Sequence, residues 1–585
     1  MNKFKQLTSI IGCTILLLIL LVYWTPSAGA TPDDSAGGTI SSPNERVLRY
    51  RPNVNELRED QIQALKDAVR YMHALPKEDS RNWDYQANIH GTFDEMTSDL
   101  WNKCQHGSQY FLPWHRAYLY HFEEILREVW KENKSLESPY EERAEDELVL
   151  PYWNYDSLNE DDLKIPEIFR EGSMCQSWAK GEDCNPLYVD DKHRGNLHHD
   201  DVDDTHPEEF KLDIDLNKLT NTTDRTDFCF TKQGEDEVPG FEPEDPGCIG
   251  PDNNGVFGGR YSGTLLGTGP SRGKGRLEAY PHDIVHIQVG GSMLPDNILE
   301  DDLLSCENRA WMSNPNCSAR DPLFWVHHAN IDRMWAEWSQ DHDSPDQDSS
   351  VWKNGDDENQ VTFIDRHGDK KTYNISTFAI KDTRCYGYRY NSNEANSDSS
   401  IPDDCPPVLP IQSQQMKGRI LSEEIQERRK TLGQRIKRPQ KLAESLTSRV
   451  LRGRTETIEV ATSVLEEREE SESGSLFPNG KTPVLIIENL RYEPGAPIYD
   501  IYIKDNKEGD RQLVGSLALF AVQQGEDWSF EIKEPLMAII GERGIKMNNL
   551  LVELESPQSV SQTRALRPGY RIAEIGFDGV RIELQ

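Results

Sequence analysis

Positive charge is scarce in this sequence compared with negative charge. The 585 residues include 64 Lys and Arg against 101 Asp and Glu, which gives a formal net charge of −37 at pH 7. A surface of that sign repels phosphate backbones, so we expect no nucleic acid as the main partner. Hydrophobic residues at 36% are sufficient to build a core, which excludes a wholly disordered chain.

Long apolar runs are also missing, except for one near the N-terminus. Two lysines precede an apolar stretch over residues 10–24, and small residues follow it up to Ala30. This order is typical of a secretory signal peptide over residues 1–30, with an uncleaved signal anchor as the alternative. Either interpretation predicts that residues 31–585 are exported (secreted, periplasmic or in an endomembrane lumen), and a retained signal would anchor them to the membrane.

Cysteine is present in an odd number once the leader is set aside. Cys13 lies in the leader, and the other cysteines of the 10 belong to the exported part. An odd number in an oxidising compartment predicts that one cysteine has a fate other than a disulfide.

The chain is too long for one ordinary hydrophobic core, so at least two domains are expected. Residues 31–45 are small and polar, and we predict that they are disordered. The predicted parts after them are a mainly α domain over residues 46–405, a charged linker over 406–480 and an all-β domain over 481–585.

Helical periodicity marks the first domain. Apolar residues three and four positions apart predict a helix from Glu59 to about Ala74. Similar patterns predict helices from Trp114 to beyond Val129, over 282–289 and over 325–338, and the intervening regions look irregular.

The second domain follows a basic segment, Met416–Arg454, that has a helical pattern and exposed Arg–Arg and Lys–Arg pairs. We interpret it as a partly helical connector that is sensitive to proteases. From Pro483 the apolar period changes to two, which predicts a small sandwich or barrel. The predicted strands are Val484–Glu488, Tyr499–Ile503, Leu513–Phe520, Trp528–Ile532, Leu536–Ile540, Leu550–Leu554 and Val580–Leu584.

A glutamate is absent where one class of metal protein would need it. His282 and His286 are four residues apart, so a helix presents both imidazoles on one face, as a metal pair requires. A zinc protease of the common type has Glu directly after the first histidine as general base, and this sequence has Asp283 there.

Two groups of histidines supply more ligands than one metal ion needs. The first group is His90, His106 and His115, and the second adds His327 and His328 to the pair described above. All-imidazole sites suit copper, which cycles between Cu(I) and Cu(II), while zinc stays open on spacing alone.

Two longer motifs around these histidines resemble a known family. The segment GSQYFLPWHRAYL (residues 107–119) resembles the first copper signature of tyrosinases and other polyphenol oxidases, and DPLFWVHHANIDR (321–333) resembles the second. The resemblance covers roughly residues 45–400. It implies a type-3 dicopper centre, with two copper ions, in a four-helix core.

The resemblance also implies ligands for each ion. His90, His106 and His115 match the ligands of the first copper, and His282, His286 and His328 match those of the second, with His327 in a neighbouring, non-ligand place. Cys104 stands two residues before His106, the spacing at which fungal members form a cysteine–histidine thioether. An ordinary disulfide or a free thiol is the alternative.

Two acidic residues near the second group match positions of interest in the family. Glu278 stands where plant members carry an acidic residue proposed to hold a water beside copper, although a solvated loop carboxylate is the alternative reading. Asp283 replaces the Asn that usually assists it, which leaves hydroxylation of monophenols less certain than oxidation of diphenols.

The family resemblance extends more weakly to the C-terminal half. Tyr388-Arg389-Tyr390 resembles the motif that closes the catalytic domain, and Tyr499–Ile503 resembles part of the C-terminal domain of plant polyphenol oxidases. That domain shields the copper site in the family, which implies a latent pro-enzyme and an activating protease that acts on the connector.

The resemblance implies a phenol oxidase that uses O2 to convert o-diphenols to o-quinones. Hydroxylation of monophenols is a second activity that the sequence leaves open. A haemocyanin-like O2 carrier is the alternative, and a zinc hydrolase is a third reading. The natural phenol and the oligomeric state stay open.

Overall fold

The computed structural model of this chain leaves the expected leader and the predicted disordered segment outside the residues it describes. The described residues are 47–106, 110–134, 148–157, 159–178, 183–190, 193–194, 212, 260–261, 272–273, 277–291, 293–295, 305–307, 310–341, 353–354, 357–390, 400–411, 440–445, 447–452, 454–461, 483–493, 496–497, 499–505, 511–517, 520, 525–540, 549–556 and 570–584.

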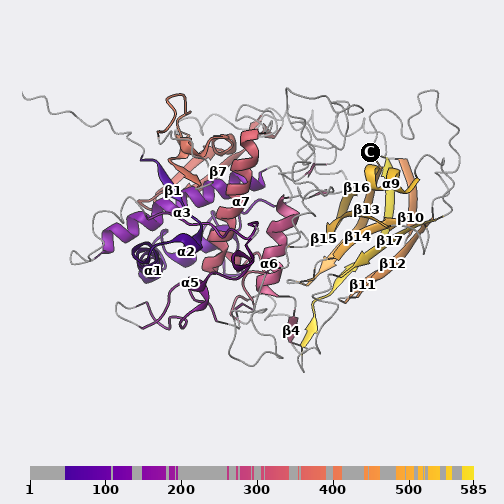
Figure 1. Cartoon of the computed structure of the whole chain (residues 1–585), viewed down its shortest axis with the longest axis horizontal. Helices are drawn as coiled ribbons and strands as arrows, with labels where there is room; N and C mark the ends of the chain where they lie inside the picture. The colour runs from indigo at the N-terminus through magenta and orange to yellow at the C-terminus, as the bar shows by residue number, and fades with distance from the viewer. Residues whose placement is uncertain are drawn as a thin grey trace, which may run out of the picture. The chain divides into compact units, whose positions relative to one another are not determined.

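Helices build the described part of the N-terminal half, as the periodicity predicts (Figure 1). The first has the predicted bounds and buries Leu65, Val69 and Met72 on one face. The α-helices of the whole described chain are α1 (Glu59–Ala74), α2 (Trp83–His90), α3 (Phe111–Asn133), α5 (Glu167–Arg170), α6 (Asp283–Gly290), α7 (Pro322–Asp341) and α9 (Lys533–Ile540), and a π-helical turn, η6 (Glu278–His282), precedes α6.

Local chemistry sets where the two long core helices begin. α3 starts at Phe111, three residues before the predicted position, and has Pro113 in its first turn, where a missing N–H costs no hydrogen bond. α7 starts at Pro322, and the carboxylate of Asp321 accepts a hydrogen bond from Leu323 N at 2.9 Å. Arg194, which is fully buried, fixes that carboxylate through an ion pair of 2.6 Å.

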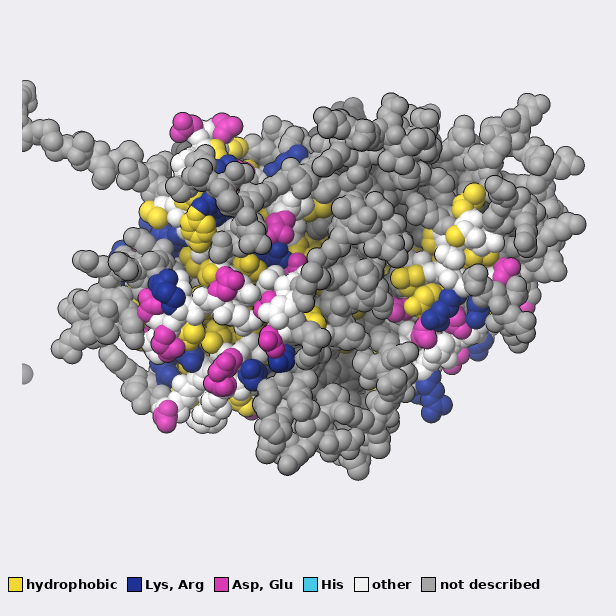
Figure 2. All heavy atoms as spheres, in the orientation of Figure 1, with side chains coloured by type: hydrophobic (Ala, Val, Ile, Leu, Met, Phe, Trp, Pro, Cys, Tyr) yellow, Lys and Arg dark blue, Asp and Glu magenta, His cyan; other side chains and the backbone are white. Residues whose placement is uncertain are grey.

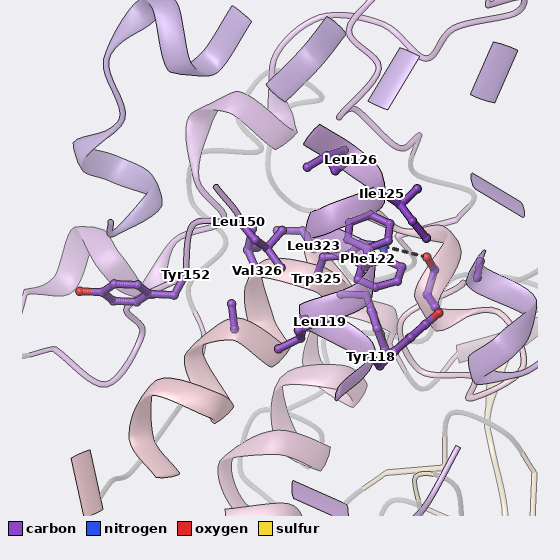
Figure 3. Close-up of a cluster of buried hydrophobic side chains, with 14 of the residues drawn as sticks. Tyr118, Leu119, Phe122, Ile125, Leu126, Leu150, Tyr152, Leu323, Trp325 and Val326 are labelled. Carbon is purple, nitrogen blue, oxygen red and sulfur yellow. Dashed lines mark hydrogen bonds between the residues drawn. The ribbon is translucent and has the colours of Figure 1, made fainter. Parts of the chain in front are cut away.

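Aromatic side chains fill the core where α7 crosses α3. The rings of Phe122 and Trp325 are nearly parallel, with centroids 3.4 Å apart, and both lie among Leu119, Leu150 and Val326 (Figure 3). Burial of these large rings stabilises the helix crossing that carries the histidines.

A short parallel pairing joins the two ends of the helical domain. Strand β1 (Arg49–Arg51) pairs with β9 (Tyr388–Tyr390). Arg51 reaches from β1 to Glu123 on α3 at 2.7 Å, and the hydroxyl groups of Tyr388 and Tyr390 each donate to Asp332 at 2.6 Å. These charges are buried and paired, and removal of one partner from such a pair costs about 3–5 kcal/mol.

Three disulfides tie the loops of the described chain, namely Cys175–Cys184, Cys306–Cys317 and Cys385–Cys405. Among the described residues, Cys104 is the cysteine that takes no part in a disulfide. The odd cysteine expected from the sequence is therefore compatible with Cys104.

Most strands of the C-terminal half form one large sheet with a hydrophobic core of its own, and β2 and β3, from residues 260–273, extend this sheet at one edge. Its strands follow the hydrogen-bonded order β15-β14-β17-β12-β10-β20-β13-β16-β3-β2, and β11 and β19 attach beside this path. The strands are β2 (Arg260–Tyr261), β3 (Arg272–Gly273), β10 (Gln440–Ser445), β11 (Arg449–Leu451), β12 (Glu456–Ala461), β13 (Pro483–Tyr492), β14 (Tyr499–Lys504), β15 (Gln512–Leu517), β16 (Glu526–Glu531), β17 (Asn549–Glu555), β19 (Ile575–Phe577) and β20 (Gly579–Leu584).

Shorter pairings lie outside this sheet. Strand β5 pairs with β6, β7 with β8, and β4 with β18. These strands are β4 (Met293–Pro295), β5 (Lys353–Asn354), β6 (Asp357–Glu358), β7 (Gln360–Ile364), β8 (Lys370–Asn374) and β18 (Tyr570–Ile572).

Two predicted elements are wrong. The predicted strand Leu536–Ile540 is instead the end of helix α9. A short apolar run is compatible with both the strand period of two and the helix period of 3.6, so the sequence does not distinguish them. The helical pattern expected up to Arg454 fails from residue 440 onward, where β10 pairs with β20 and β12. Pairing with strands distant in sequence outweighs local helix preference here.

The described surface in Figure 2 carries interspersed acidic and basic side chains on the face shown. No helix among the described residues is long and apolar enough to cross a membrane. The expected signal segment lies outside those residues, so the prediction of export stays a prediction.

Candidate metal centre

The first histidine group is assembled from two helices and a loop. His90, Cys104, His106 and His115 offer ligand atoms that all lie within 4.8 Å of one another. α2 is capped by Asn82, whose side chain accepts from the backbone of Asp84, and it delivers His90 at its last position. His115 stands in the second turn of α3.

Backbone carbonyls fix the rings of two members of this group. His90 Nδ1 is 2.9 Å from Pro315 O, and His115 Nδ1 is 2.7 Å from Phe111 O. A carbonyl oxygen only accepts, so Nδ1 carries the proton in each ring. The lone pair therefore resides on Nε2, the atom left to bind a metal.

The second group comes from η6, α6 and α7. His282, His286, His327 and His328 meet the same 4.8 Å criterion, and each is buried. Pro281 lies inside the π-helical turn, where its missing N–H disfavours regular α-helix geometry. Such turns recur at functional sites, and this one sets His282 beside His286 with ring centroids 4.6 Å apart.

The Nδ1 atoms of His282 and His286 also have acceptors. His282 Nδ1 is 2.9 Å from Asp283 Oδ1, and His286 Nδ1 is 2.9 Å from Met312 O. Asp283 is fully buried, so its carboxylate acts on His282 with little screening by solvent. Both rings again present Nε2 toward the centre of the group.

The adjacent histidines of α7 have different partners. His328 Nε2 lies 3.4 Å from His286 Nε2, whereas His327 Nδ1 is hydrogen-bonded to the hydroxyl of Tyr155 at 2.9 Å. Two Nε2 atoms that face each other at this distance can share one ion. The contact with Tyr155 fixes the ring of His327, and the buried Nε2 of His327 has no hydrogen-bond partner among the described residues.

The two groups face each other. The rings of His115 and His328 are stacked with centroids 4.3 Å apart, and His106 lies 5.5 Å from His282. Phe324 packs against His90 from one group and His328 from the other, at 4.8 and 4.3 Å. The six predicted ligands and His327 thus surround one centre, and Phe324 packs against both groups.

Burial keeps these imidazoles neutral. It lowers the pKa of His90 to about 4, and it holds the pKa values of His115, His282, His286 and His328 well below the usual range. Neutral imidazole is the form that binds a metal ion.

The residues present fit a pair of copper ions. Among the described residues, the buried Nε2 atoms of His90 and His282 have no hydrogen-bond partner, which is costly unless a ligand satisfies them. A donor set of neutral imidazoles suits copper. The first group would hold one ion and the second group the other.

Cys104 lies beside its predicted partner. Its Sγ is 2.9 Å from Nδ1 and 3.7 Å from Nε2 of His106. The sulfur thus faces the edge of the ring between the two nitrogens. This approach is compatible with the predicted thioether, which stays a prediction.

Glu278 is fully buried at the start of η6. The alternative of a solvated loop carboxylate is therefore wrong. Its backbone carbonyl lies 3.2 Å from His282 Nδ1, so the residue is directly adjacent to the second group.

Phe520, in a turn beyond β15, contacts both groups. Its ring is parallel to that of His286 at a centroid distance of 3.9 Å and lies edge-on to His106 and His282 at 5.6 Å each. The ring is 2% exposed. A residue of the C-terminal half therefore lies over the open side of the histidine rings.

A helical domain with two facing groups of buried imidazoles defines a dinuclear metal protein. Residues 80–341 match the family described as "Common central domain of tyrosinase". Together with the copper signatures and the relatives described below, this match relates residues 80–341 to the tyrosinase and polyphenol oxidase family. The cofactor of that family is a type-3 pair of copper ions, and the two histidine groups fit it.

Two curated relatives illustrate the similarity. Tyrosinase HcTyr1 of Hahella sp. (strain CCB-MM4) is 28% identical over 371 residues, which cover 59% of this chain and 63% of that protein. The latent form of chloroplastic polyphenol oxidase from Prunus armeniaca is 29% identical over 298 residues, 50% of this chain and 40% of that protein. The chain thus matches less than two thirds of the length of either relative.

Among solved structures, latent apple tyrosinase aligns with a TM-score of 0.49 and 19% identity, over 93% of this chain and 98% of that chain.

Sequence reasoning missed three kinds of contact at this centre. It treated Phe520 as the end of a strand, it did not single out Tyr155, and it had no signal for the carbonyls of Met312 and Pro315. A carbonyl acceptor depends on backbone position alone. Every residue has a backbone carbonyl, so the sequence does not show which one will accept a hydrogen bond from a histidine.

Proposed function

We propose that this protein is a copper-dependent phenol oxidase that uses O2 to oxidise o-diphenols to o-quinones and is made in a latent form. The observation that carries the proposal is the pair of facing, neutral histidine groups. Copper held there would supply the one-electron redox chemistry that links O2 to a phenol. His90, His106 and His115 are the proposed ligands of one ion, and His282, His286 and His328 those of the other.

The side chains around the ions have separate proposed tasks. Asp283 holds the proton of His282 Nδ1 and thereby orients the ring and increases the basicity of Nε2. Glu278 is the proposed acceptor for the phenolic proton, because it is buried next to His282 and carries the remaining carboxylate at this end of η6. Hydroxylation of monophenols is the finer part of the proposal and depends on Glu278.

Latency is proposed to come from Phe520. Its ring covers His286, so a phenol ring cannot stack on that imidazole while Phe520 is in place. The connector around residues 412–439 lies outside the described residues and contains the basic pairs Arg428-Arg429 and Lys437-Arg438. Cleavage there by a protease is the proposed activating step, and residues 46–405 are the proposed catalytic domain.

The test is catechol oxidation by copper-loaded full-length protein before and after limited trypsin treatment, with copper measured in both samples. We expect two copper ions per chain and a rate of quinone formation that rises after cleavage. Copper binding without turnover in the cleaved protein would favour the haemocyanin-like alternative. Zinc in place of copper in protein from its natural source would contradict the proposal.

A further inference from the structure

One short segment contacts a proposed ligand of each copper ion. Pro315 O accepts from His90 Nδ1 in the first group, and Met312 O accepts from His286 Nδ1 in the second, both at 2.9 Å. These acceptors are only three residues apart in the sequence. We call residues 310–317 the clamp segment.

Glycines let the clamp segment approach both helices closely. Gly91 directly follows His90, and a Cβ at this position would lie 2.7 Å from Pro315 O. Gly290 ends α6, and a Cβ there would lie 2.1 Å from the backbone N of Ser313. Real Cβ atoms do not approach backbone atoms so closely, so any larger residue would push the clamp segment away from the histidines.

The clamp segment is itself constrained. Cys317 is bonded to Cys306, and Trp311 Nε1 donates to Cys306 O at 2.8 Å. At the end of the segment, the backbone N atoms of Cys317 and of the next residue, Ser318, both donate to Asn314 O, at 2.9 and 2.8 Å. The disulfide therefore closes a compact turn that holds the two carbonyls at fixed places.

Two of the other proposed ligands have their Nδ1 acceptors outside this segment. His115 bonds to the carbonyl of Phe111 in its own helix, and His282 bonds to the neighbouring Asp283. The orientation of each of these two rings is therefore set by an acceptor that is close to it in sequence. His90 and His286 depend instead on a part of the chain that is distant from each of them in sequence.

We propose that the clamp segment is a positioning element shared by both copper sites, and that the Cys306–Cys317 disulfide maintains copper affinity at both. The carbonyls keep the proton on Nδ1 of His90 and His286, so Nε2 keeps its lone pair for the metal. The inference rests on the proposed copper function. It adds a coupling between the two sites that ligand identity alone would not produce.

The test is the double variant Cys306→Ser with Cys317→Ser in the full chain, compared with Cys385→Ser and Cys405→Ser, which removes a different disulfide. Copper affinity is measured by competition with a chelator, ion by ion. In the clamp variant we expect both ions to bind about 10- to 100-fold more weakly, the usual effect of losing an outer partner of a metal ligand. The control variant should keep both affinities.

A second readout does not require copper. Nitrogen-15 spectra of histidine rings in copper-free protein report which nitrogen carries the proton. We expect His90 and His286 to change from the Nδ1–H form to a mixture in the clamp variant, while His115 is unchanged. An identical change in all three rings would indicate general loosening and would overturn the proposal.

The remaining outcomes are also decisive. Weaker binding of only one ion, or of neither, would contradict a shared clamp. If the double variant does not fold, Gly290→Ala tests the same contact, because its Cβ must displace Ser313, and an unchanged His286 ring would overturn the proposal. If wild-type protein binds no copper, the proposed function fails, whereas the ring spectra still test the clamp.

Discussion

The ring of Phe520 lies parallel to the imidazole of His286, with centroids 3.9 Å apart and planes inclined by 13°. The two residues are 234 positions apart in the printed sequence, one near the end of β15 and the other in α6. An aromatic substrate would need the same place beside the imidazole. The contact therefore links the C-terminal half directly to the chemistry proposed for the helical half.

Replacement of Phe520 by alanine should activate the uncleaved chain. An aromatic contact of this kind is worth about 1 kcal/mol beyond its buried area, so we expect the rate of catechol oxidation to rise about 5-fold or more. Phe530→Ala is the control, because Phe530 packs against the core of the same half. A variant at Phe520 that stays as slow as wild type, in a chain that trypsin does activate, would refute the role of this ring.

The neighbouring histidines of α7 should behave differently when each is changed to alanine. His328→Ala should leave one copper ion per chain, because it removes the Nε2 that faces His286. His327→Ala should keep both ions, because the family resemblance gives His328 and not His327 as the ligand. Elemental analysis of the two purified variants distinguishes them, and the reverse pattern would assign the ligand to His327.

The carboxylate of Asp283 should matter more for its bond to His282 than for its charge. Asp283→Ala should weaken the second copper about 10- to 100-fold, since it removes an outer partner of a ligand. Asp283→Asn keeps an acceptor oxygen and should lose less. Chelator competition measures both variants, and equal losses would mean that the negative charge is the essential feature.

Cys104 should be unavailable to alkylating reagents in copper-loaded protein after denaturation and reduction. The six cysteines of the described disulfides should react under these conditions, which supplies the internal control. A thioether with His106 would leave the peptide that carries both residues lighter by two hydrogen atoms. Full alkylation of Cys104 would show that the sulfur only lies beside the ring.

Acid sensitivity should depend on His121, a buried histidine of α3 outside the proposed ligand set. Burial lowers the pKa of His121 to about 3, so the unfolded chain binds more protons than the folded chain between pH 6.5 and about 3. Stability therefore falls as the pH drops through this window, by up to about 1.4 kcal/mol per pH unit from this group.

His121→Phe should make that decline shallower, because the variant has no imidazole to protonate on unfolding. Urea unfolding of the full chain at several pH values between 7 and 4.5 measures the slope. His367→Phe changes an exposed histidine and should leave the slope as in wild type. Identical slopes for His121→Phe and wild type would contradict this account.

Local patterns in the sequence predicted much of the helical domain. The apolar spacing predicted α1 from Glu59 to about Ala74, as observed, and similar spacing predicted most of α3 and α7, which each begin three residues earlier than expected. The C-terminal half was less predictable. β10 and β11 depend on pairing with β20 and β19, more than a hundred residues away, and their local sequence resembles a helix.

The same division applies to the centre. Type and spacing mark two groups of histidines, and the family resemblance implies which six of them bind metal. The structure brings the members of each group together, and their role as ligands stays a proposal. Their orientation depends on partners that the sequence does not mark, such as the carbonyl of Met312 and the hydroxyl of Tyr155. The tertiary fold alone determines which oxygen reaches which Nδ1.

The pairing of β1 with β9 holds together segments from near the start and near the end of the helical domain, because Arg49 lies opposite Tyr388. A protease that cuts in the connector would separate the C-terminal half and leave this pairing intact, with Arg51 still bonded to Glu123.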